Sequence, residues 1–228
     1  MFLEENASPH PTLVLVCKRP AIGHGKQRLA AQVGAEPACL IAERLLDCAL
    51  EDLGDWPGAT VIAPDQRVHR DWASALAPQA LCLPQSSGNL GERLNALDRT
   101  LRAAGHHRLV FIGSDAPALR PEHYQQVRIA LREADTVLIA ASDGGVVLMA
   151  SNRPWPDLTE LPWSTADLGQ ALAAACREAG HSVALCGESF DIDEQADLTR
   201  ALGELADDPR PARRRLLHSL ASTRGEHA

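Results

Sequence analysis

Four cations and two glycines lie together in one short segment, Lys18-Arg19-Pro20-Ala21-Ile22-Gly23-His24-Gly25-Lys26-Gln27-Arg28-Leu29. Glycines allow backbone N–H groups to approach a phosphate, and lysine and arginine supply charge-assisted donors. A helix that starts just beyond the segment would add a favourable dipole. The segment therefore predicts a polyphosphate-binding loop, in which the binding residues are Lys18, Arg19, Pro20, Gly23, Gly25, Lys26 and Arg28. A solvated basic loop is the alternative.

Two common phosphate-binding motifs do not fit this segment. A Walker A loop requires glycine where Pro20 stands and serine or threonine where Gln27 stands. A dinucleotide fingerprint requires a third glycine, but Arg28 occupies that position. The loop must therefore bind phosphate in another way.

Carboxylates follow two of the short apolar segments. Asp115 comes just after the apolar residues 109–112, and Asp193 belongs to the group Asp191-Ile192-Asp193. Mg2+ and Mn2+ prefer oxygen ligands and take one or two protein carboxylates together with phosphate and water. We expect Asp115 and Asp193 to bind such a cation, and Lys26, Arg28 and Asp115 to carry the catalysis. Each aspartate could instead cap the helix that follows it.

Further polar residues follow the other apolar segments. Gln85, Gly88 and Arg93 come after residues 81–83 and are expected to contact the nucleotide. The Asp143-Gly144-Gly145 group is a hairpin signal and could also line an acceptor pocket. Trp163 is assigned to the acceptor pocket as well, although packing is the more common role of such a residue. Thr165 is a candidate N-cap.

The pattern of apolar and polar residues along the chain predicts the strands and helices that position these residues. β-branched or leucine-rich runs indicate strands at 12–17, 59–63, 81–83, 109–112, 136–140, 146–150 and 182–186. Apolar residues recurring at three and four indicate helices at 35–53, 90–104, 121–134, 165–179 and 194–205. Strand and helix alternate, which predicts an α/β fold with a mostly parallel sheet covered on both faces. Ligands bind at the carboxyl ends of such strands.

Length and composition narrow the class of protein. A chain of 228 residues suits a single domain, predicted at 1–206, followed by a tail at 207–228 that contains Arg213-Arg214-Arg215. A solvated helix or frayed end is favoured for the tail, with a partner or phosphate contact as the alternative. The net charge of −8 argues against general nucleic-acid binding. No apolar run reaches about 18 residues, so we expect a cytoplasmic protein without a membrane span. No feature predicts the oligomeric state.

Several motifs, taken in order, resemble a bacterial family of GT-A-like transferases that are often labelled glycosyltransferases. They are Lys18-x-Pro20, Gly25-Lys26-x-Arg28-Leu29, Gly88-x-Leu90-Gly91-x-Arg93, Gly113-Ser114-Asp115-x-Pro117, Asp143-Gly144-Gly145, Trp163-Ser164 and Asp191-Ile192-Asp193. The resemblance implies the GT-A, or nucleotide-diphosphosugar transferase, fold with a seven-stranded mixed sheet. Gln27 and Val146-Val147 depart from the family pattern, where threonine and aromatic residues are usual. The motifs are also similar to those of 2-phospholactate guanylyltransferases, molybdenum-cofactor guanylyltransferases and CMP-sugar synthetases.

The resemblance implies a nucleotide and a small-molecule acceptor as ligands, and it allows two reactions. In nucleotidyl transfer, the loop cations hold the phosphates of an NTP while a phosphate- or carboxylate-bearing acceptor attacks the α-phosphorus. In glycosyl transfer, a hydroxyl attacks the sugar of an NDP-sugar. The four loop cations favour nucleotidyl transfer, because a triphosphate carries more charge to neutralise. A nucleotide-binding protein without turnover is the third possibility.

Overall fold

A seven-stranded sheet forms the centre of the computed structural model, which describes residues 10–225, with the strand order β3-β2-β1-β4-β6-β5-β7. The strands are β1 Thr12–Cys17, β2 Thr60–Pro64, β3 Leu81–Cys82, β4 Leu109–Ile112, β5 Thr136–Ala141, β6 Val146–Ser151 and β7 Val183–Ser189. β6 runs antiparallel to both of its neighbours, β4 and β5, and the other pairs are parallel. The predicted mostly parallel, mixed sheet is confirmed.

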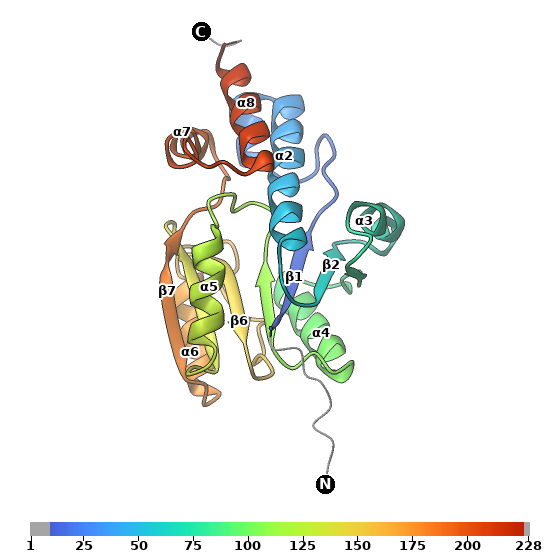
Figure 1. Ribbon diagram of the computed structural model, residues 1–228, viewed down its shortest axis with the longest axis vertical. Helices are drawn as coiled ribbons and strands as arrows, with labels where there is room; N and C mark the ends of the chain where they lie inside the picture. Colours follow the sequence, from blue (N-terminus) through green and yellow to red (C-terminus); the bar gives the residue numbers. More distant parts are fainter. Residues whose placement is uncertain (1–9, 226–228) are drawn as a thin grey trace.

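Helices cover both faces of this sheet (Figure 1). They are α1 Gln27–Val33, α2 Ala35–Gly54, α3 Arg70–Leu76, α4 Leu90–Ala103, α5 Pro121–Ala130, α6 Leu168–Glu178, α7 Gln195–Glu204 and α8 Pro211–Gly225, with a short 3-10 turn, η1 Arg67–His69, before α3. One core cluster joins the sheet to α2, α3 and α5, and a second joins the opposite face to α4 and α6. The α/β architecture with helices on both faces is confirmed.

Successive side chains of the central strands point to opposite faces of the sheet, and this explains the two core clusters. In β1, Leu13 and Leu15 pack into one cluster, whereas Val14 packs into the other. In β4, Val110 and Ile112 face the first cluster and Phe111 faces the second. Strands that are buried on both faces read as continuous apolar runs, because successive side chains point to opposite sides. This is why the strands at 12–17 and 109–112 are visible in the sequence.

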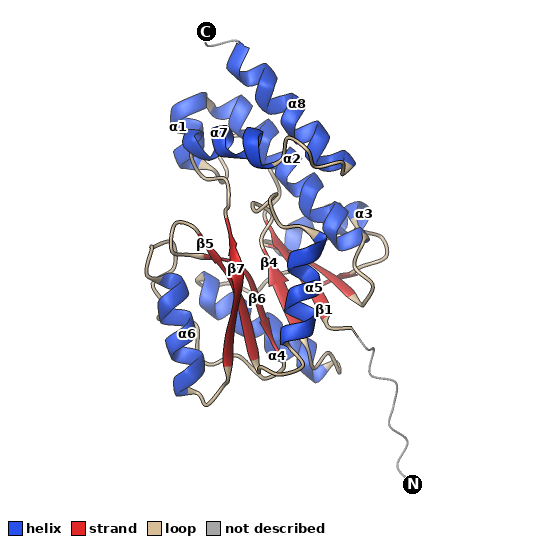
Figure 2. Ribbon diagram, turned by 60° about the vertical axis from the view of Figure 1, so that its left-hand side comes forward, coloured by secondary structure: helices blue, strands red, loops and turns tan. Residues whose placement is uncertain are grey.

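A third core cluster lies at one end of the sheet, where α1, α2, α7 and α8 gather (Figure 2). Leu29 and Val33 of α1 pack there with Leu216 and Leu220 of α8. Phe190 and Ile192, which flank Asp191 between β7 and α7, belong to the same cluster. This layer of helices therefore supports two of the segments in which the sequence predicts functional residues.

The end of the chain differs from the predicted solvated segment. Helix α8 packs against α2, and the side chains of Ala212, Arg213, Leu216 and Leu220 are buried. The apolar residues recur every four positions and so form one stripe along the helix, which is a packing signal. Among the residues of α8 up to 221, Arg214 and Arg215 lie on the outer, exposed side. The expectation of a solvated or frayed end is wrong for the inner side of this helix.

Helix boundaries show the other differences. Helix α6 begins at Leu168 with Asp167 as its N-cap residue, so the prediction that Thr165 caps this helix is wrong. Thr165 instead forms a local turn, in which its Oγ1 accepts a hydrogen bond from the amide of Asp167 at 3.3 Å. Helices α1 and α3 have seven residues each and were not predicted as separate elements. Two turns are too few for a clear apolar periodicity.

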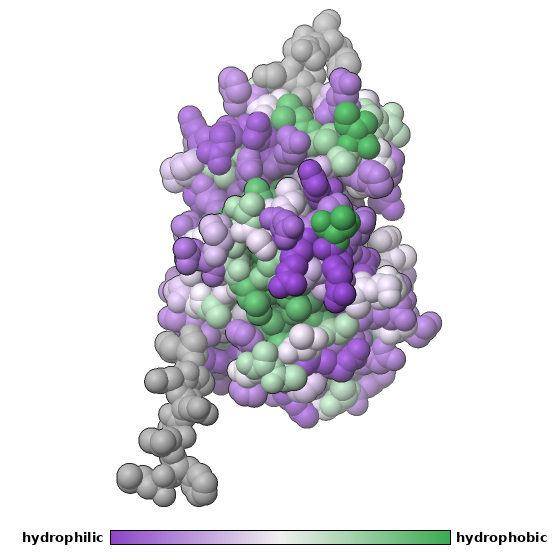
Figure 3. Space-filling model, turned by 90° about the vertical axis from the view of Figure 1, so that its right-hand side faces the viewer, coloured by the Kyte–Doolittle hydropathy of each residue, from purple (hydrophilic) through white to green (hydrophobic). Residues whose placement is uncertain are grey.

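Several large apolar side chains are exposed on the molecular surface. On the side that carries α3, Figure 3 shows apolar patches separated by polar residues. Val68, Leu76 and Leu81 are exposed by 78%, 40% and 49%. Single apolar residues of this kind are common on protein surfaces. Among residues 10–225, no helix has the length and apolar character needed to cross a membrane.

Candidate active site

A cleft of about 660 Å³ lies at the carboxyl ends of β1 and β4. Residues Lys18 and Arg19, which follow β1, and Gly113 to Asp115, which follow β4, form part of its wall. The antiparallel strand β6 contributes its first residues, because its amino end lies beside the carboxyl end of β4. The cleft therefore occupies the position at which open α/β sheets bind their ligands.

The loop between β1 and α1 is a tight turn whose cations line this cleft. Gly23 and Gly25 adopt positive φ values of 81° and 74°, a conformation that strongly favours glycine. The Gln27 side chain donates to the carbonyl of Gly23 at 2.7 Å and closes the turn. Among the residues predicted for this loop, Gly23 alone lies outside the wall of the cleft: Lys18, Arg19, Pro20, Gly25, Lys26 and Arg28 all contribute to it.

The cations of the loop have different surroundings. Lys18 and Arg28 are exposed, and the Arg19 guanidinium lies 5.9 Å from the centre of the Trp72 ring. Lys26 stands at the N-cap position of α1 in the left-handed conformation, with φ of 46°. A non-glycine residue in this conformation carries some backbone strain. Lys26 is less exposed than Lys18, Arg19 and Arg28.

Lys26 lies between two of the predicted metal ligands. Its ammonium donates to Asp193 Oδ1 at 2.7 Å and to Asp115 Oδ2 at 3.3 Å. The Lys26 side chain is only 13% exposed and is therefore largely buried. Burial lowers the pKa of Lys26, but the charges of Asp115 and Asp193 more than offset this effect, and the pKa is raised. Lys26 is therefore fully charged at neutral pH.

Three carboxylates gather around this ammonium. One oxygen each from Asp115, Asp191 and Asp193 lies within 4.8 Å of the others. The amide of Ile192 donates to the carbonyl of Asp115 at 3.0 Å and so ties the two acid-bearing segments together. Burial and the neighbouring charges of Asp115, Asp193 and Asp143 raise the pKa of Asp191 to about 7. Asp191 was not among the predicted metal ligands, although its spacing of two from Asp193 in an extended segment could have indicated it.

Neither predicted metal ligand caps a helix. Helix α5 begins at Pro121 with Arg120 as its N-cap residue, which lies five positions after Asp115. Helix α7 has Glu194 at its N-cap, and the Asp197 carboxylate accepts hydrogen bonds from the amides of Asp193 and Glu194. The capping alternative is therefore wrong for both Asp115 and Asp193, whose carboxylates line the cleft.

Gln85 and Arg93 form a connected pair in the cleft wall. The buried Gln85 side chain donates to the carbonyl of Ala63 at 2.7 Å and accepts from Arg93 Nη1 at 3.2 Å. Arg93 Nε also donates to the carbonyl of Asn89 at 3.3 Å. Gly88 has a φ of 111° and lies outside the wall of the cleft. Gln85 therefore holds Arg93 in place, and Arg93 is the more accessible of the two.

The predicted acceptor residues lie on the other side of the cleft. Asp143 Oδ1 accepts from the amide of Gly145 at 2.9 Å within the β5–β6 hairpin. Gly144 has a φ of 92° and packs so closely on the carbonyl of Ala166 that no Cβ would fit there. Trp163 donates to the carbonyl of Leu158 at 2.9 Å and packs against the α4–α6 core. Asp143, Gly145 and Trp163 line the cleft, whereas Gly144 does not.

The three aspartates fit a hard divalent cation. Carboxylate oxygens are the ligands that Mg2+ and Mn2+ prefer, and three of them exceed the usual number that a protein supplies. The Lys26 ammonium contacts two of these carboxylates and so occupies the position that a bound cation would take. A cation bound to Asp115 and Asp193 would therefore replace Lys26 and release its side chain towards the cleft.

Comparison with known families identifies the chain at the family level. Residues 48–165, more than half of the sequence, match the family described as "Uncharacterized protein conserved in bacteria (DUF2064)". The chain belongs to the DUF2064 family. The matched region includes Asp115, Asp143 and Trp163, whereas Lys26 and Asp193 lie outside it. No curated protein matches the chain.

Solved structures show which fold this DUF2064 member has. A "putative nucleotide-diphospho-sugar transferase" from Desulfovibrio desulfuricans G20 is similar with a TM-score of 0.83 and 23% identity, over 95% of this chain and 97% of that one. A cytidylyltransferase from Leptospira borgpetersenii has a TM-score of 0.55 and 10% identity, over 95% and 96%. The 4-diphosphocytidyl-2C-methyl-D-erythritol synthase from Anaerococcus prevotii has 0.51 and 11%, over 86% and 99%. The predicted GT-A-like, nucleotide-diphosphosugar transferase fold is confirmed.

Proposed function

We propose that this protein is a metal-dependent transferase that uses a nucleotide, and that it transfers a nucleotidyl group from an NTP to a small phosphate- or carboxylate-bearing acceptor. One observation carries the proposal. The cations of the β1–α1 loop and the carboxylates of Asp115, Asp191 and Asp193 line the same cleft, although they lie far apart in the sequence. A nucleotide polyphosphate with a divalent cation is the ligand that needs both groups side by side.

The residues of the loop would bind the phosphates. Lys18, Arg19 and Arg28 line the cleft with exposed side chains and would neutralise the negative charge of the β- and γ-phosphates. Lys26, once released from Asp115 and Asp193, would reach the same phosphates. A bound Mg2+ or Mn2+ would withdraw charge from the phosphate oxygens as a Lewis acid. Catalysis would consist mainly of positioning and charge stabilisation.

The acceptor would enter from the side of the β5–β6 hairpin. Asp143, Gly145 and Trp163 line that side, together with apolar residues at the start of β6. Asp143 is close enough to the three other aspartates to raise the pKa of Asp191. An anionic acceptor would therefore need the divalent cation, or Lys26, to balance the charge at this end of the cleft.

A glycosyl transfer from an NDP-sugar is the second candidate function. It is favoured by the similarity, with a TM-score of 0.83, to a protein described as a nucleotide-diphospho-sugar transferase. The two reactions release different products, because nucleotidyl transfer releases pyrophosphate and glycosyl transfer releases a nucleoside diphosphate. A nucleotide-binding protein without turnover would release neither.

The test is to incubate the protein with each NTP and each common NDP-sugar, with Mg2+ or Mn2+, and to measure pyrophosphate and nucleoside diphosphate. We expect slow, metal-dependent release of pyrophosphate from one NTP. Asp115→Asn is the inactive control, and Asp207→Asn, an exposed carboxylate outside the cleft, is the matched control that keeps activity. Release of nucleoside diphosphate from an NDP-sugar would select glycosyl transfer. Release of neither product in any mixture would contradict both reactions and leave nucleotide binding without turnover.

A further inference from the structure

Arg213 of α8 is a fully buried cation. Its Nη2 donates to Asp52 Oδ2 at 2.6 Å and its Nη1 donates to Glu51 Oε2 at 2.9 Å, so two carboxylates of α2 neutralise it. A second arginine, Arg210, pairs with Asp52 Oδ1 at 2.9 Å and with Asp208. Two arginines thus face three carboxylates, those of Glu51, Asp52 and Asp208. A lysine would carry the same charge as Arg213, so neutralisation alone does not explain why this residue is an arginine.

Two further donors of Arg213 contact the segment that follows Asp115, whereas its Nη1 also donates to the carbonyl of Cys48 in α2 at 2.7 Å. Arg213 Nε donates to the carbonyl of Pro117 at 3.1 Å, and its Nη2 lies 3.4 Å from the carbonyl of Leu119. Arg210 Nη2 donates to the same Leu119 carbonyl at 2.9 Å. The planar guanidinium group has five donors in a fixed geometry, so one side can hold carboxylates while the other holds carbonyls. A lysine could not serve both sides.

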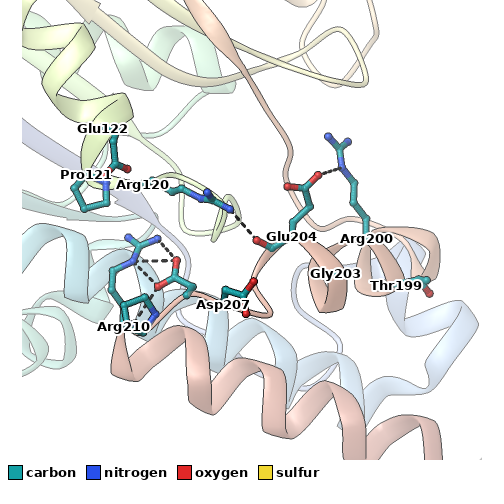
Figure 4. Close-up of a pocket in the computed structure, with 11 residues that line it drawn as sticks. Arg120, Pro121, Glu122, Thr199, Arg200, Gly203, Glu204, Asp207 and Arg210 are labelled. Carbon is teal, nitrogen blue, oxygen red and sulfur yellow. Dashed lines mark hydrogen bonds and ion pairs between the residues drawn. The ribbon is translucent and has the colours of Figure 1, made fainter.

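The same segment is also held from α7, beside a pocket of about 870 Å³ that Figure 4 shows. Arg120 Nη2 donates to the carbonyl of Glu204 at 2.9 Å, and Arg210 Nη2 donates to Asp208 Oδ2 at 2.7 Å. The segment from Asp115 to Arg120 has no helix or strand of its own. It is held at Pro117, Leu119 and Arg120 by Glu204 of α7, by Arg210 just before α8, and by Arg213 of α8.

The acid-bearing segments are coupled to each other as well. The amide of Ile192 donates to the carbonyl of Asp115 at 3.0 Å, and Ile192 lies between Asp191 and Asp193. A shift of the segment around Pro117 would therefore move Asp115 and, through Ile192, the two other aspartates. Pro117 is only two residues from Asp115, so a displacement of the Pro117 backbone would also move the Asp115 carboxylate.

We propose that Arg213 is a positioning residue of the cleft, which sets the place of Asp115 through the carbonyl of Pro117 and so the spacing of the three carboxylates. Arg213 does not touch the ligand; it lies behind the site and acts through the backbone. The part of this proposal that concerns cation binding rests on the proposed function, whereas the part that concerns the order of the two segments does not.

The experiment compares Arg213→Lys, which keeps the charge for Glu51 and Asp52, with Arg214→Lys, an exposed neighbour in the same helix. Arg213→Met is a second variant that removes the charge. Two quantities are measured on the folded proteins: the affinity for Mn2+ alone, and the hydrogen exchange of single amides. The informative amides are those of Ile192 and of Leu119, which bonds to Ala116, and the reference is the amide of Leu13 in β1.

We expect Arg213→Lys to bind Mn2+ roughly 2- to 30-fold more weakly than wild type, the range found for residues that couple indirectly to a site. The amides of Ile192 and Leu119 should exchange faster relative to Leu13, and Arg214→Lys should match wild type in both measurements. A purely structural role would instead accelerate exchange at all three amides together and leave the affinity of the folded protein unchanged.

Either of two results would overturn the proposal: unchanged Mn2+ affinity and unchanged relative exchange in Arg213→Lys, or an Arg213→Lys protein that does not fold. If Arg213→Met alone fails to fold, the lysine variant decides. If wild type binds no Mn2+, the proposed function fails, and the exchange of Ile192 and Leu119 then decides the positioning role by itself.

Discussion

Lys26 should act as a competitor of the divalent cation when no nucleotide is present. Its ammonium contacts Asp193 at 2.7 Å and Asp115 at 3.3 Å, where a bound cation would also sit. Replacement by methionine keeps most of the length of the side chain and removes the charge. We therefore expect Lys26→Met to bind Mn2+ more tightly than wild type, and to bind the nucleotide more weakly.

The structure sets the size of this effect. A hydrogen bond to a charged group contributes about 1.5–3 kcal/mol. The carboxylates of Asp115 and Asp193 are 40% and 45% exposed, so solvent screening reduces each contact. Taking about 1 kcal/mol for each contact, wild type must break about 2 kcal/mol of interaction to admit the cation. Because about 1.4 kcal/mol is a factor of ten, Lys26→Met should bind Mn2+ on the order of 10- to 100-fold more tightly.

The assay is a titration of the nucleotide-free protein with Mn2+, in which free Mn2+ is followed by electron paramagnetic resonance. Lys18→Met is the matched control, because Lys18 belongs to the same loop but is exposed and does not contact the three aspartates. It should change Mn2+ affinity by less than the Lys26 variant. Unchanged or weaker Mn2+ binding by Lys26→Met would refute the reasoning, since it would show that Lys26 and the cation do not share a place.

Three further predictions concern the site and its support. Asp115→Asn should fold normally and lose Mn2+-dependent nucleotide binding in calorimetric titration; undiminished binding would move the cation to Asp191 and Asp193 alone. Gly144→Ala should lower the free energy of unfolding by about 1–3 kcal/mol in urea titration, because of its positive φ and the nearby Ala166 carbonyl. Gly203→Ala in α7, where a Cβ meets nothing within 4 Å, is the control and should be neutral or stabilising. Burial, and then the charge of Arg153, lower the pKa of His181, whose ring contacts Thr136 Oγ1 at 2.9 Å. The unfolded chain therefore binds this proton more readily, and the stabilising effect of neutral His181 should be lost as pH falls below about 6.5. When the pH is lowered from 7.5 to 5.5, the urea concentration at the unfolding midpoint should fall by more in wild type than in His181→Gln. His107 is exposed, and in the control variant His107→Gln the midpoint should fall by as much as in wild type.

The strands and the rough place of the site could be predicted because local patterns determine them. Apolar runs such as 12–17 and 109–112 match β1 and β4, and the rule that parallel strands end at one edge predicts that Asp115 lies beside the basic loop. The contact between Lys26 and Asp115 agrees with that placement. The roles assigned to these residues in binding and catalysis remain predictions.

The remaining features depend on contacts between distant segments. The left-handed backbone conformation of Lys26 cannot be predicted from the residue type, because most residues in this conformation are glycine or asparagine. The inclusion of Asp191 depends on how the segment between β7 and α7 packs on the third core cluster. By composition, the run Arg213-Arg214-Arg215 predicts a solvated patch. The burial of Arg213 follows from the packing of the apolar stripe along α8.

The hydrogen bond between Lys26 and Asp193 joins residues that are 167 positions apart. Contacts of such long sequence separation form late, because the chain must first close a large loop. During translation at about 5–20 residues per second, Lys26 would wait roughly 10–30 s before its partner Asp193 is even synthesised. All seven strands of the sheet precede Asp191 in the chain, so a product truncated before Asp191 would keep the residues of the sheet and lack two of the three carboxylates.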